Sequence, residues 1–502
     1  MRGQYMNELI AILVLGPFIS AALALSVRRL TILRDVITIA SLFAFTVGSA
    51  FLLYFVNTDG TFVVKVGGWQ PDLGIVLVAD LFAAMILFIA LATIFVVEVY
   101  SISQRASIWG ADPYLVGPIL LVLTAGVTLA ILTGDLFTLF VSFELILVAS
   151  YVLLTHQGRP PQIRSGMTYV VMNLFASTLF LLGLAFVYAA TGTVNMALLA
   201  QRIPELQDGV RLGIGLWFLV VFGTKAAIFP LFSWLPDSYP TAPTTITAVF
   251  AGLLTKIGVY SIIRFHTITG MDDLGPIILV AAGLTMLVGV IGALAQNDVK
   301  RILSFHIISQ IGYMLMGLGL FSVAGIAGAI LFLFHHMPTK TVLFLVGGLI
   351  ESSAGTSSLD RISGLAFRRP IIAVLFAIPA LSLAGLPPFS GFVAKLSLVE
   401  AGIQSGSAPI VVVALFVSIL TLLSMAKIWL EVFWGNKAGS VPNEDQVPQP
   451  GSWRNRLMIS TTSFAVIGTL LIAASAGPLW DMSVRSASEL TGSGFYSNEV
   501  LK

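Results

Sequence analysis

Long apolar runs separated by short polar breaks repeat along almost the whole 502-residue chain. A run of roughly 18 apolar residues or more is long enough to cross a bilayer as a helix. The pattern therefore predicts an all-α polytopic membrane protein with about fourteen transmembrane helices. The predicted spans are residues 7–27, 31–56, 74–100, 113–133, 135–155, 165–191, 211–234, 242–264, 274–295, 301–321, 323–350, 371–402, 408–434 and 456–477.

Composition supports this fold class and narrows the chemistry. The chain is 57% hydrophobic and 10% charged, whereas soluble domains carry roughly 25% charged residues. It contains no cysteine, which excludes thiolate zinc sites and cysteine-ligated iron–sulfur clusters. We therefore expect no cofactor and no metal site here, and any redox centres to lie in other subunits. A net charge of +2 gives no reason to expect nucleic acid as a partner.

Lysines and arginines are distributed unequally between the two sets of loops. One set holds fourteen of them and the other, which includes both termini, holds seven. Because positive residues favour the cytoplasmic side, we predict a multi-pass protein of the bacterial inner membrane with both termini outside. In this assignment Arg264 belongs to an outer loop.

Five lysines lie inside predicted spans, where a charge costs at least ~2.5–3.5 kcal/mol, and two of them belong to neighbouring spans. Lys225 is followed by Pro230, which cannot donate to the carbonyl of Ala226, so the predicted seventh helix should be discontinuous at this point. Lys256 lies deep in the next span. We interpret both lysines as positions on a proton path. The alternative is a pair of fixed charges that hold helices together.

Glu144 is the carboxylate in the middle of the span 135–155. Ionisable groups within membrane spans usually have a function, so we predict that Glu144 and Lys225 form a buried pair on the proton path. The alternatives are a purely structural ion pair and a neutral, protonated acid. Asp135, near the start of the same helix, is predicted to be its N-cap.

The span 301–321 carries a polar stripe at helical spacing. His306, Ser309, Gln310 and Tyr313 lie on one face, which must point into the bundle or a wet cavity. We regard His306, Ser309 and Tyr313 as candidates for a relay, and hydrogen bonding between helices is the alternative for this stripe.

The span 323–350 combines titratable residues with a proline. His335 and His336 precede Lys340, and His336 and Lys340 lie one turn apart on one face. Histidine titrates near physiological pH, so a histidine–lysine step suits a proton shuttle. Pro338 lies between them and frees the carbonyl of Phe334.

The span 371–402 resembles the broken span near Lys225, with the order reversed. Pro387 and Pro388 interrupt it, and Lys395 follows two turns later. Broken helices in corresponding positions of two halves indicate an inverted-repeat transporter. Within a single membrane domain, 1–502, we predict four parts: 1–111, a first inverted five-helix repeat 112–264, a second repeat 273–435, and 436–502 with a cytoplasmic loop, the last helix and a tail.

Three further segments complete the prediction. Residues 194–206 are expected to form a short interfacial helix, 435–455 a cytoplasmic loop, and the polar tail 478–502 a loose segment. For Asp80, near the outer end of the third span, a structural and a functional role are both left open.

The motifs around these residues resemble a known family. They are GDLFTLFVSFELILVASYVLL, KAAIFPLFSWLPDSYPTAPTTITAVFAGLLTKIGVY, NDVKRILSFHIISQIGYM and LAGLPPFSGFVAK. Across about 110–435 the chain resembles the proton-translocating membrane subunits shared by respiratory complex I, membrane-bound hydrogenases and Mrp-type multisubunit cation/proton antiporters. VGGWQPDLGIVLVADLFAAM and SFHIISQIGYM are most similar to the D-subunit branch of the Mrp antiporters. Pro338 departs from the family pattern, which leaves the path through this helix open.

The resemblance implies exchange of Na⁺ or another monovalent cation for protons, by a secondary transporter subunit rather than an enzyme. Glu144–Lys225 would be the switchable pair, and Lys395 the exit. Lys256 and the His335/His336–Lys340 region would form the central relay. The implied partners are the other subunits of a hetero-oligomeric Mrp complex. Two alternatives remain: a proton-pumping subunit of complex I or a membrane-bound hydrogenase, and a non-transporting membrane scaffold.

Overall fold

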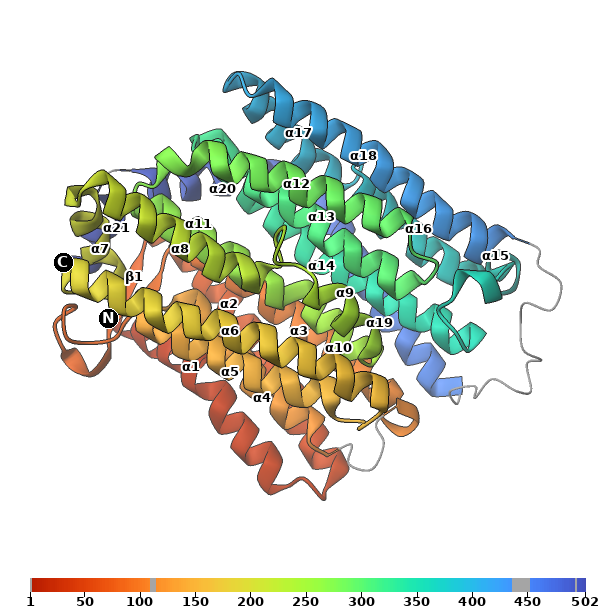
Figure 1. Ribbon diagram of the computed structural model, residues 1–502. Helices are drawn as coiled ribbons and strands as arrows, with labels where there is room; N and C mark the ends of the chain where they lie inside the picture. The colour runs from red at the N-terminus through yellow and green to blue at the C-terminus, as the bar shows by residue number, and fades with distance from the viewer. Residues whose placement is uncertain (1, 109–113, 436–451, 493) are drawn as a thin grey trace.

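The computed structural model describes residues 2–108, 114–435, 452–492 and 494–502. In these ranges it is a bundle of roughly parallel and antiparallel helices with both termini near one end (Figure 1). Twelve of the described helices are long and apolar enough to cross a membrane, and two shorter apolar helices are Val116–Leu132 and Pro370–Ala384. Each of the fourteen predicted spans overlaps one of these segments. The prediction of an all-α polytopic membrane protein is confirmed.

The first third of the chain contains six long helices and a hairpin. The elements are α1 (Arg2–Ser26), α2 (Thr31–Asp59), β1 (Phe62–Lys65), a 3-10 turn η1 (Val66–Gly68), β2 (Val76–Ala79), α3 (Leu81–Ile108), α4 (Val116–Leu132), α5 (Leu136–Thr155) and α6 (Pro160–Thr191). The strands pair antiparallel, Phe62 with Ala79. Residues 74–80 were expected to be helical and are not, because this segment forms β2 and the loop before α3.

The middle third holds the first broken helix and the most buried helices. The elements are α7 (Met196–Arg202), η2 (Ile203–Glu205), α8 (Asp208–Ala226), α9 (Trp234–Ser238), η3 (Tyr239–Thr241), α10 (Thr244–Val249), the π-helical turn η4 (Phe250–Leu254), α11 (Thr255–Ile268), η5 (Asp272–Leu274), α12 (Gly275–Leu294), α13 (Val299–Gly319) and α14 (Val323–Ala354). Helix α7 is the predicted short helix within 194–206. Helix α14 continues through Pro338 without a break.

The last third holds the second broken helix and a helical C-terminus. The elements are η6 (Leu359–Arg361), α15 (Leu365–Arg368), α16 (Pro370–Ala384), α17 (Ser390–Gln404), α18 (Ala408–Ile428), the π-helical turn η7 (Trp429–Trp434), α19 (Ser452–Ala474), α20 (Ala476–Thr491) and α21 (Phe495–Leu501). The prediction of a loose tail is wrong, because the tail forms α20 and α21. Most of the predicted loop 435–455, namely 436–451, lies outside the described residues.

Both predicted helix breaks are present, and their backbones match. Helix α8 ends where Ala227 adopts the left-handed conformation (φ 63°, ψ 50°), and α16 ends at Gly385 (φ 87°, ψ 40°). After each of these residues the next N–H returns to a carbonyl five positions earlier: Ile228 donates to Gly223 and Leu386 to Leu381. A cis X–Pro peptide follows in each break, Phe229–Pro230 and Pro387–Pro388.

A second match relates α5 to α13. Asp135 caps α5 by accepting from the Thr138 N–H (2.7 Å), and Asp298 caps α13 by accepting from the Arg301 N–H (3.0 Å). Asp135 forms a β-bridge with residue 195, and Asp298 forms one with residue 358, so both bridges join residues 60 positions apart. The predicted N-cap at Asp135 is therefore present.

The helices that follow α5 and α13, namely α6 and α14, also correspond to each other. Helices α6 and α14 both have 32 residues, and each ends at a left-handed glycine, Gly192 or Gly355. Five membrane crossings separate the two sets, so the second set runs in the opposite direction through the bundle. This correspondence supports the inverted repeats, while the domain boundaries at 112–264 and 273–435 stay a prediction.

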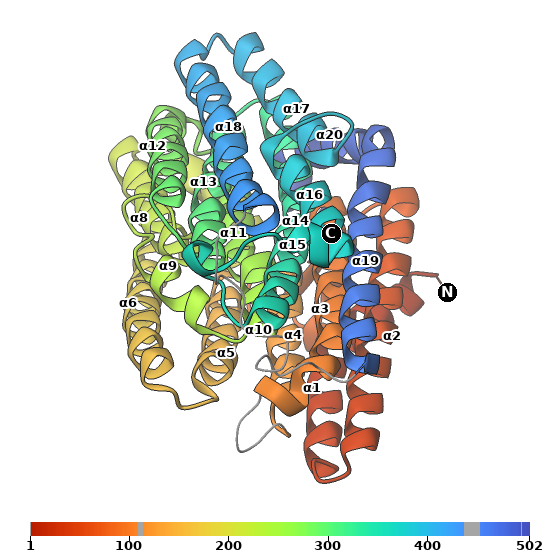
Figure 2. The same cartoon turned by 90° about the vertical axis from the view of Figure 1, so that its right-hand side faces the viewer.

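The core lies along the centre of the bundle. The segment Thr244–Ile268 is completely buried, and α13 and α14 are almost completely buried, whereas α1, α2, α6, α12, α18 and α19 expose much of their apolar surface. Figure 2 shows α13 and α14 enclosed between the outer helices. Of the residues of interest, Lys256, His306, His335, His336 and Lys340 lie on these inner helices, and Lys225 and Lys395 lie on α8 and α17.

Candidate ion-translocation site

Lys225 is the penultimate residue of α8, directly before the first helix break. Its buried ammonium donates to the Asn173 carbonyl (3.2 Å) and to the Ser177 hydroxyl (3.0 Å), both on α6. It also lies 5.6 Å from the centroid of the Phe143 ring. Helices α6 and α5 thus surround the ammonium with two neutral oxygens and a ring face.

Glu144 lies on α5 next to Phe143, but it does not form an ion pair with Lys225 in this structure. Its side chain is half-buried, and Oε1 has no hydrogen-bond partner among the described residues. A cavity of about 20 Å³ lies between α5, α6 and α8, lined by Lys225, Phe143 and Asn173 among others. That volume is enough for roughly one water molecule. The direct contact in the predicted pair is absent here, and the cavity is lined by Lys225 but not by Glu144.

Lys256 is fully buried, with 0% of its surface exposed, at the second position of α11. The π-helical turn η4 precedes it, and the ammonium donates to the Ala251 carbonyl inside that turn and to the Thr255 hydroxyl (3.2 Å). A π-turn interrupts the regular α-helical bonds and often occurs at functional positions. This turn supplies the carbonyl acceptor that the ammonium requires in an apolar core.

Helices α8 and α11 approach each other closely between the two lysines. A Cβ atom on Gly258 would lie 2.6 Å from the backbone nitrogen of Ala226. Gly258 is two positions after Lys256, and Ala226 is one position after Lys225. The contact therefore fixes the two lysine-bearing segments against each other.

Lys340 and His336 lie one turn apart on α14, as predicted, and both are buried. The Lys340 ammonium donates to the Leu303 carbonyl of α13 (3.2 Å). The His336 ring lies on Phe332, with centroids 6.0 Å apart and an interplanar angle of 23°. Neither ring nitrogen of His336 has a hydrogen-bond partner among the described residues.

His335 connects α14 to the second helix break. Its Nδ1 is hydrogen-bonded to the Ser390 hydroxyl (2.8 Å) and lies 3.3 Å from the Thr339 hydroxyl. Ser390 is the first residue of α17, directly after the break that contains Pro387 and Pro388. The predicted proline break thus places the start of α17 against His335.

Lys395 lies one and a half turns further along α17. Its ammonium donates to the Ala384 carbonyl at the end of α16 (3.1 Å) and to the Ser418 hydroxyl of α18 (3.0 Å). It also lies over the Tyr313 ring, 4.8 Å from the centroid. The Tyr313 hydroxyl donates to the Ala414 carbonyl (2.6 Å) and shares Ser418 (2.9 Å). Tyr313 of the predicted stripe is therefore part of the Lys395 environment.

The other residues of the polar stripe, His306, Ser309 and Gln310, differ in how many hydrogen bonds they form. His306 Nε2 is hydrogen-bonded to the Ser424 hydroxyl (2.6 Å), while its Nδ1 has no partner among the described residues. Ser309 donates to the Met286 carbonyl of α12 (3.0 Å), which is a contact between helices. Both polar atoms of the buried Gln310 side chain are without a partner in the described part of the chain.

The sequence did not predict the buried ion pair between Asp80 and Arg264. Arg264 was assigned to an outer loop, but it is buried in α11, and its guanidinium contacts the Asp80 carboxylate with NH1 and NH2 (2.8 Å for NH2). The Arg264 NH2 also donates to the Tyr260 hydroxyl (2.6 Å). The available signal was the spacing of Lys256, Tyr260 and Arg264 at successive intervals of four, which is one face of a helix.

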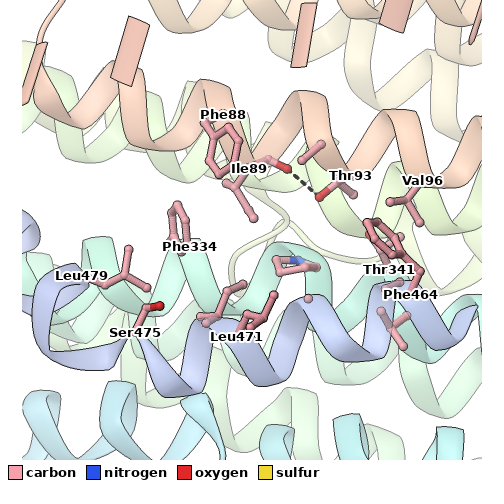
Figure 3. A pocket seen from close by; sticks show the side chains of 16 residues that line it. Phe88, Ile89, Thr93, Val96, Phe334, Thr341, Phe464, Leu471, Ser475 and Leu479 are labelled. Carbon is pink, nitrogen blue, oxygen red and sulfur yellow. Dashed lines mark hydrogen bonds between the residues drawn. The ribbon is translucent and has the colours of Figure 1, made fainter. Parts of the chain in front are cut away.

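An apolar pocket lies against α14. It has a volume of about 390 Å³ between α3, α14 and α19, and no charged side chain lines it (Figure 3). Thr93 and Thr341 of its wall also pack against Gly252 in the π-turn, where a Cβ atom would lie 2.2 Å from the Thr341 hydroxyl. The pocket is thus unsuited to an ion, but its wall supports the turn that precedes Lys256. No group of three or more metal-ligating side chains occurs in the ranges that the structure describes.

The structure is that of an all-helical polytopic membrane protein with two broken helices and a row of buried lysines. A family model described as NADH:quinone oxidoreductase/Mrp antiporter, TM, matches residues 133–421. The chain belongs to this family of membrane subunits, in the branch formed by the D subunits of Mrp antiporters.

Two relatives match over almost the full length of both chains. The D subunit of the Na(+)/H(+) antiporter of Alkalihalophilus pseudofirmus is 41% identical over 501 residues, covering 99% of this chain and 100% of that protein. The Bacillus subtilis protein with the same description is 36% identical over 502 residues, with 99% and 100% covered.

Two solved structures share the fold. A chain of the Mrp complex from Dietzia sp. DQ12-45-1b gives a TM-score of 0.89 at 32% identity, with 99% of this chain and 100% of that chain covered. A chain of the membrane-bound sulfane sulfur reductase, an archaeal respiratory membrane complex, gives 0.89 at 25% identity, with 98% and 99% covered.

Proposed function

We propose that this chain is the proton-translocating subunit of a multisubunit monovalent cation (Na⁺)/proton antiporter. It works together with the other subunits of a hetero-oligomeric complex in the bacterial cell membrane. The relatives described as D subunits of Na(+)/H(+) antiporters, and the similarity to a chain of an Mrp complex, support the class of transport.

One observation carries the proposal: a row of four buried lysines, Lys225, Lys256, Lys340 and Lys395, on α8, α11, α14 and α17. Among the described residues none of the four ammonium groups forms an ion pair, and each donates to neutral oxygens. A buried lysine without a fixed counter-charge can release and regain a proton, which an arginine cannot. The same row repels a metal cation, which favours protons as the ions that this chain moves.

Polar groups without a hydrogen-bond partner in the described part of the chain lie on α5, on α13 and on α14, which also carries Lys340. Glu144 Oε1, His306 Nδ1, Gln310 and both nitrogens of His336 have no partner among the described residues. A buried polar group left without any hydrogen bond costs about 1–3 kcal/mol, so water is the natural partner at these positions. We propose that these groups and the lysines together form the proton path, with Glu144 and Lys225 at one end and Lys395 at the other.

A redox-driven pump subunit is the second candidate, because the chain of the respiratory sulfane sulfur reductase shares the fold equally well. Sequence identity separates the two candidates. This chain is 41% identical to the D subunit of an antiporter, over 99% of its length, and 25% identical to the chain of the sulfane sulfur reductase. We therefore favour the antiporter.

The test measures sodium-driven pH changes in vesicles from antiporter-deficient cells that express the whole gene cluster. Wild type is compared with Glu144→Ala and Lys225→Ala, each normalised to assembled complex. Lys427→Ala is the matched lysine control, since Lys427 caps the end of α12 through the carbonyls of Leu294 (3.0 Å) and Gln296 (2.8 Å). The proposal predicts loss of exchange in the first two variants and activity in the control. Full activity of both Glu144→Ala and Lys225→Ala would favour a scaffold.

A further inference from the structure

The C-terminal helices α20 and α21, here called the C-terminal arm (residues 476–501), pack over one end of the bundle. Helix α20 contacts α14, α3 and α11, and α21 contacts α7. Figure 1 shows α21 beside α7, at the end of the bundle where both termini lie. This is the side predicted to face outward, and the arm covers the end of α11.

A buried charged cluster lies under the arm. Arg264 of α11 forms the ion pair with Asp80 described above, and both side chains are almost completely buried. Three rings surround the guanidinium, with its central carbon 5.3 Å from the centroid of Phe82, 5.2 Å from Tyr260 and 5.5 Å from Tyr496. Tyr496 belongs to α21, so the arm itself completes the cluster.

The cluster is aligned with Lys256, deeper in the bundle, along one face of α11. Lys256, Tyr260 and Arg264 are spaced at intervals of four and are all buried. The Arg264 NH2 donates to the Tyr260 hydroxyl (2.6 Å), which in turn donates to the Ile131 carbonyl (2.6 Å). A polar face on a completely buried helix is unusual and suggests a path for an ion.

Glu489 of α20 is half-buried, and α20 packs against α11, which carries Arg264, and against α3, which begins directly after Asp80. Burial raises the pKa of its carboxyl to about 7, and the nearby Asp80 adds to the rise. The positive charges of Arg485 and Arg264 and the Leu81 N–H lower this pKa in part. Two further titratable groups belong to this cluster. Tyr496 interacts electrostatically with Arg264 and Asp80, and Asp135 interacts with Tyr496. The carboxyl therefore combines partial exposure to water with a buried charged cluster beneath it.

We propose that Glu489 is the group through which this chain exchanges protons with the aqueous phase on the side of the C-terminal arm. The face formed by Lys256, Tyr260 and Arg264 connects it to the central lysines. The neutral Glu489 carboxyl gives its proton, through water, to the neutral Lys256 amine, which leaves a carboxylate and an ammonium. Arg264 keeps its charge throughout and holds Asp80 in place. This inference rests on the proposed proton-translocating function.

The test uses the whole complex in vesicles and varies the pH on each side separately. In Glu489→Gln we expect exchange to fall about tenfold or more, and the remaining rate to lose its dependence on pH near neutrality on the arm's side. Glu489→Asp keeps a titratable group and should keep that dependence. Glu499→Gln is the matched control, because Glu499 is on the same arm and pairs with Lys502 at the end of the chain.

A second measurement does not depend on activity. This chain contains no cysteine, so Glu489→Cys gives it a single thiol. Its labelling by a membrane-impermeant maleimide, read on this subunit after the subunits are separated on a gel, reports access from the arm's side. Labelling from that side is expected. An assembled Glu489→Gln complex with the wild-type rate and pH profile, or a Glu489→Cys variant that stays unlabelled, overturns the inference. If Lys225→Ala is inactive in the same vesicles, the proposed function stands even then, whereas an active Lys225→Ala contradicts the proposed function itself.

Discussion

The ammonium of Lys395 lies over the ring of Tyr313, 4.8 Å from its centroid, and both side chains bind the Ser418 hydroxyl. A cation over an aromatic face gains about 2 kcal/mol when it is removed from water. Lys395 has no carboxylate beside it among the described residues, so the ring and two oxygens replace a counter-charge. The protonated form of Lys395 thus depends on groups that carry no charge.

This contact predicts that two substitutions at Tyr313 slow ion exchange to different degrees. Tyr313→Phe keeps the ring and removes the hydroxyl that donates to Ala414, which should cost about 0.5–1.5 kcal/mol of stability and slow exchange moderately. Tyr313→Leu removes the ring as well and should slow exchange further. Exchange rates per assembled complex in vesicles check the order. Equal rates in the two variants would show that the ring does not support Lys395.

Gly391 should not tolerate a methyl group. A Cβ atom there would lie 1.8 Å from the Ser382 carbonyl and 3.0 Å from Nε2 of His335. Gly391→Ala must therefore move α17 away from α16 and His335, and we expect most of the exchange activity to be lost.

Gly347→Ala on α14 is the control for this prediction, since nothing lies within 4 Å of its added Cβ. Alanine in place of a helical glycine stabilises by roughly 0.5–1 kcal/mol, so this variant should assemble and exchange like wild type. Thermal unfolding of the purified complexes, together with the vesicle assay, compares the two. Wild-type behaviour of Gly391→Ala would contradict the close packing at the second break.

The Asp80–Arg264 pair should be costly to break from either side. Removal of one partner leaves the other charge buried, which typically costs about 3–5 kcal/mol. Asp80→Ala and Arg264→Ala should each lower the melting temperature of the complex, and the double variant should lose less than the sum of the two. A double-mutant cycle measures this coupling. Strict additivity would mean that the two side chains do not interact.

The docking of the C-terminal arm should weaken as the pH rises. Burial raises the pKa of Glu489 from the ordinary value of 4.5 to about 7, so the docked arm holds a proton that a released arm gives up between these values. Docking is therefore favoured below 4.5, weakens as the pH rises to about 7 and is weakest above it. Hydrogen exchange of residues 476–501 at about pH 6 and about pH 8, corrected for intrinsic rates, measures the change. It should vanish in Glu489→Gln, and an unchanged difference there would assign it to another group.

The sequence was sufficient to predict the membrane spans, the two helix breaks and the positions of four buried lysines. Apolar runs defined the spans, and Pro230, Pro387 and Pro388 marked the breaks, because proline removes a donor from the helix ladder. Lys225, Lys256, Lys340 and Lys395 are buried as expected. These features were predictable because each depends on residues that are close together in the sequence.

The partners of these charges were not predictable, because they are neutral or distant in sequence. Lys225 binds a hydroxyl and a carbonyl of α6 instead of Glu144, and nothing marks Ser177 among the many serines of the chain. Asp80 and Arg264 are 184 positions apart. The tail was expected to be loose because it is polar, but α20 is amphipathic and buries Leu490 and Ala487 against the bundle. Which side chains meet is decided by tertiary packing, which composition does not show.

The central claim is that Lys225 must release and regain a proton. Lys225→Arg tests it most directly, because arginine keeps the positive charge but stays protonated. The measurement is sodium-driven proton exchange in vesicles that hold equal amounts of assembled wild-type and variant complex. We predict that Lys225→Arg assembles and loses exchange. Exchange at the wild-type rate would contradict the claim and leave Lys225 as a fixed charge between α6 and α8.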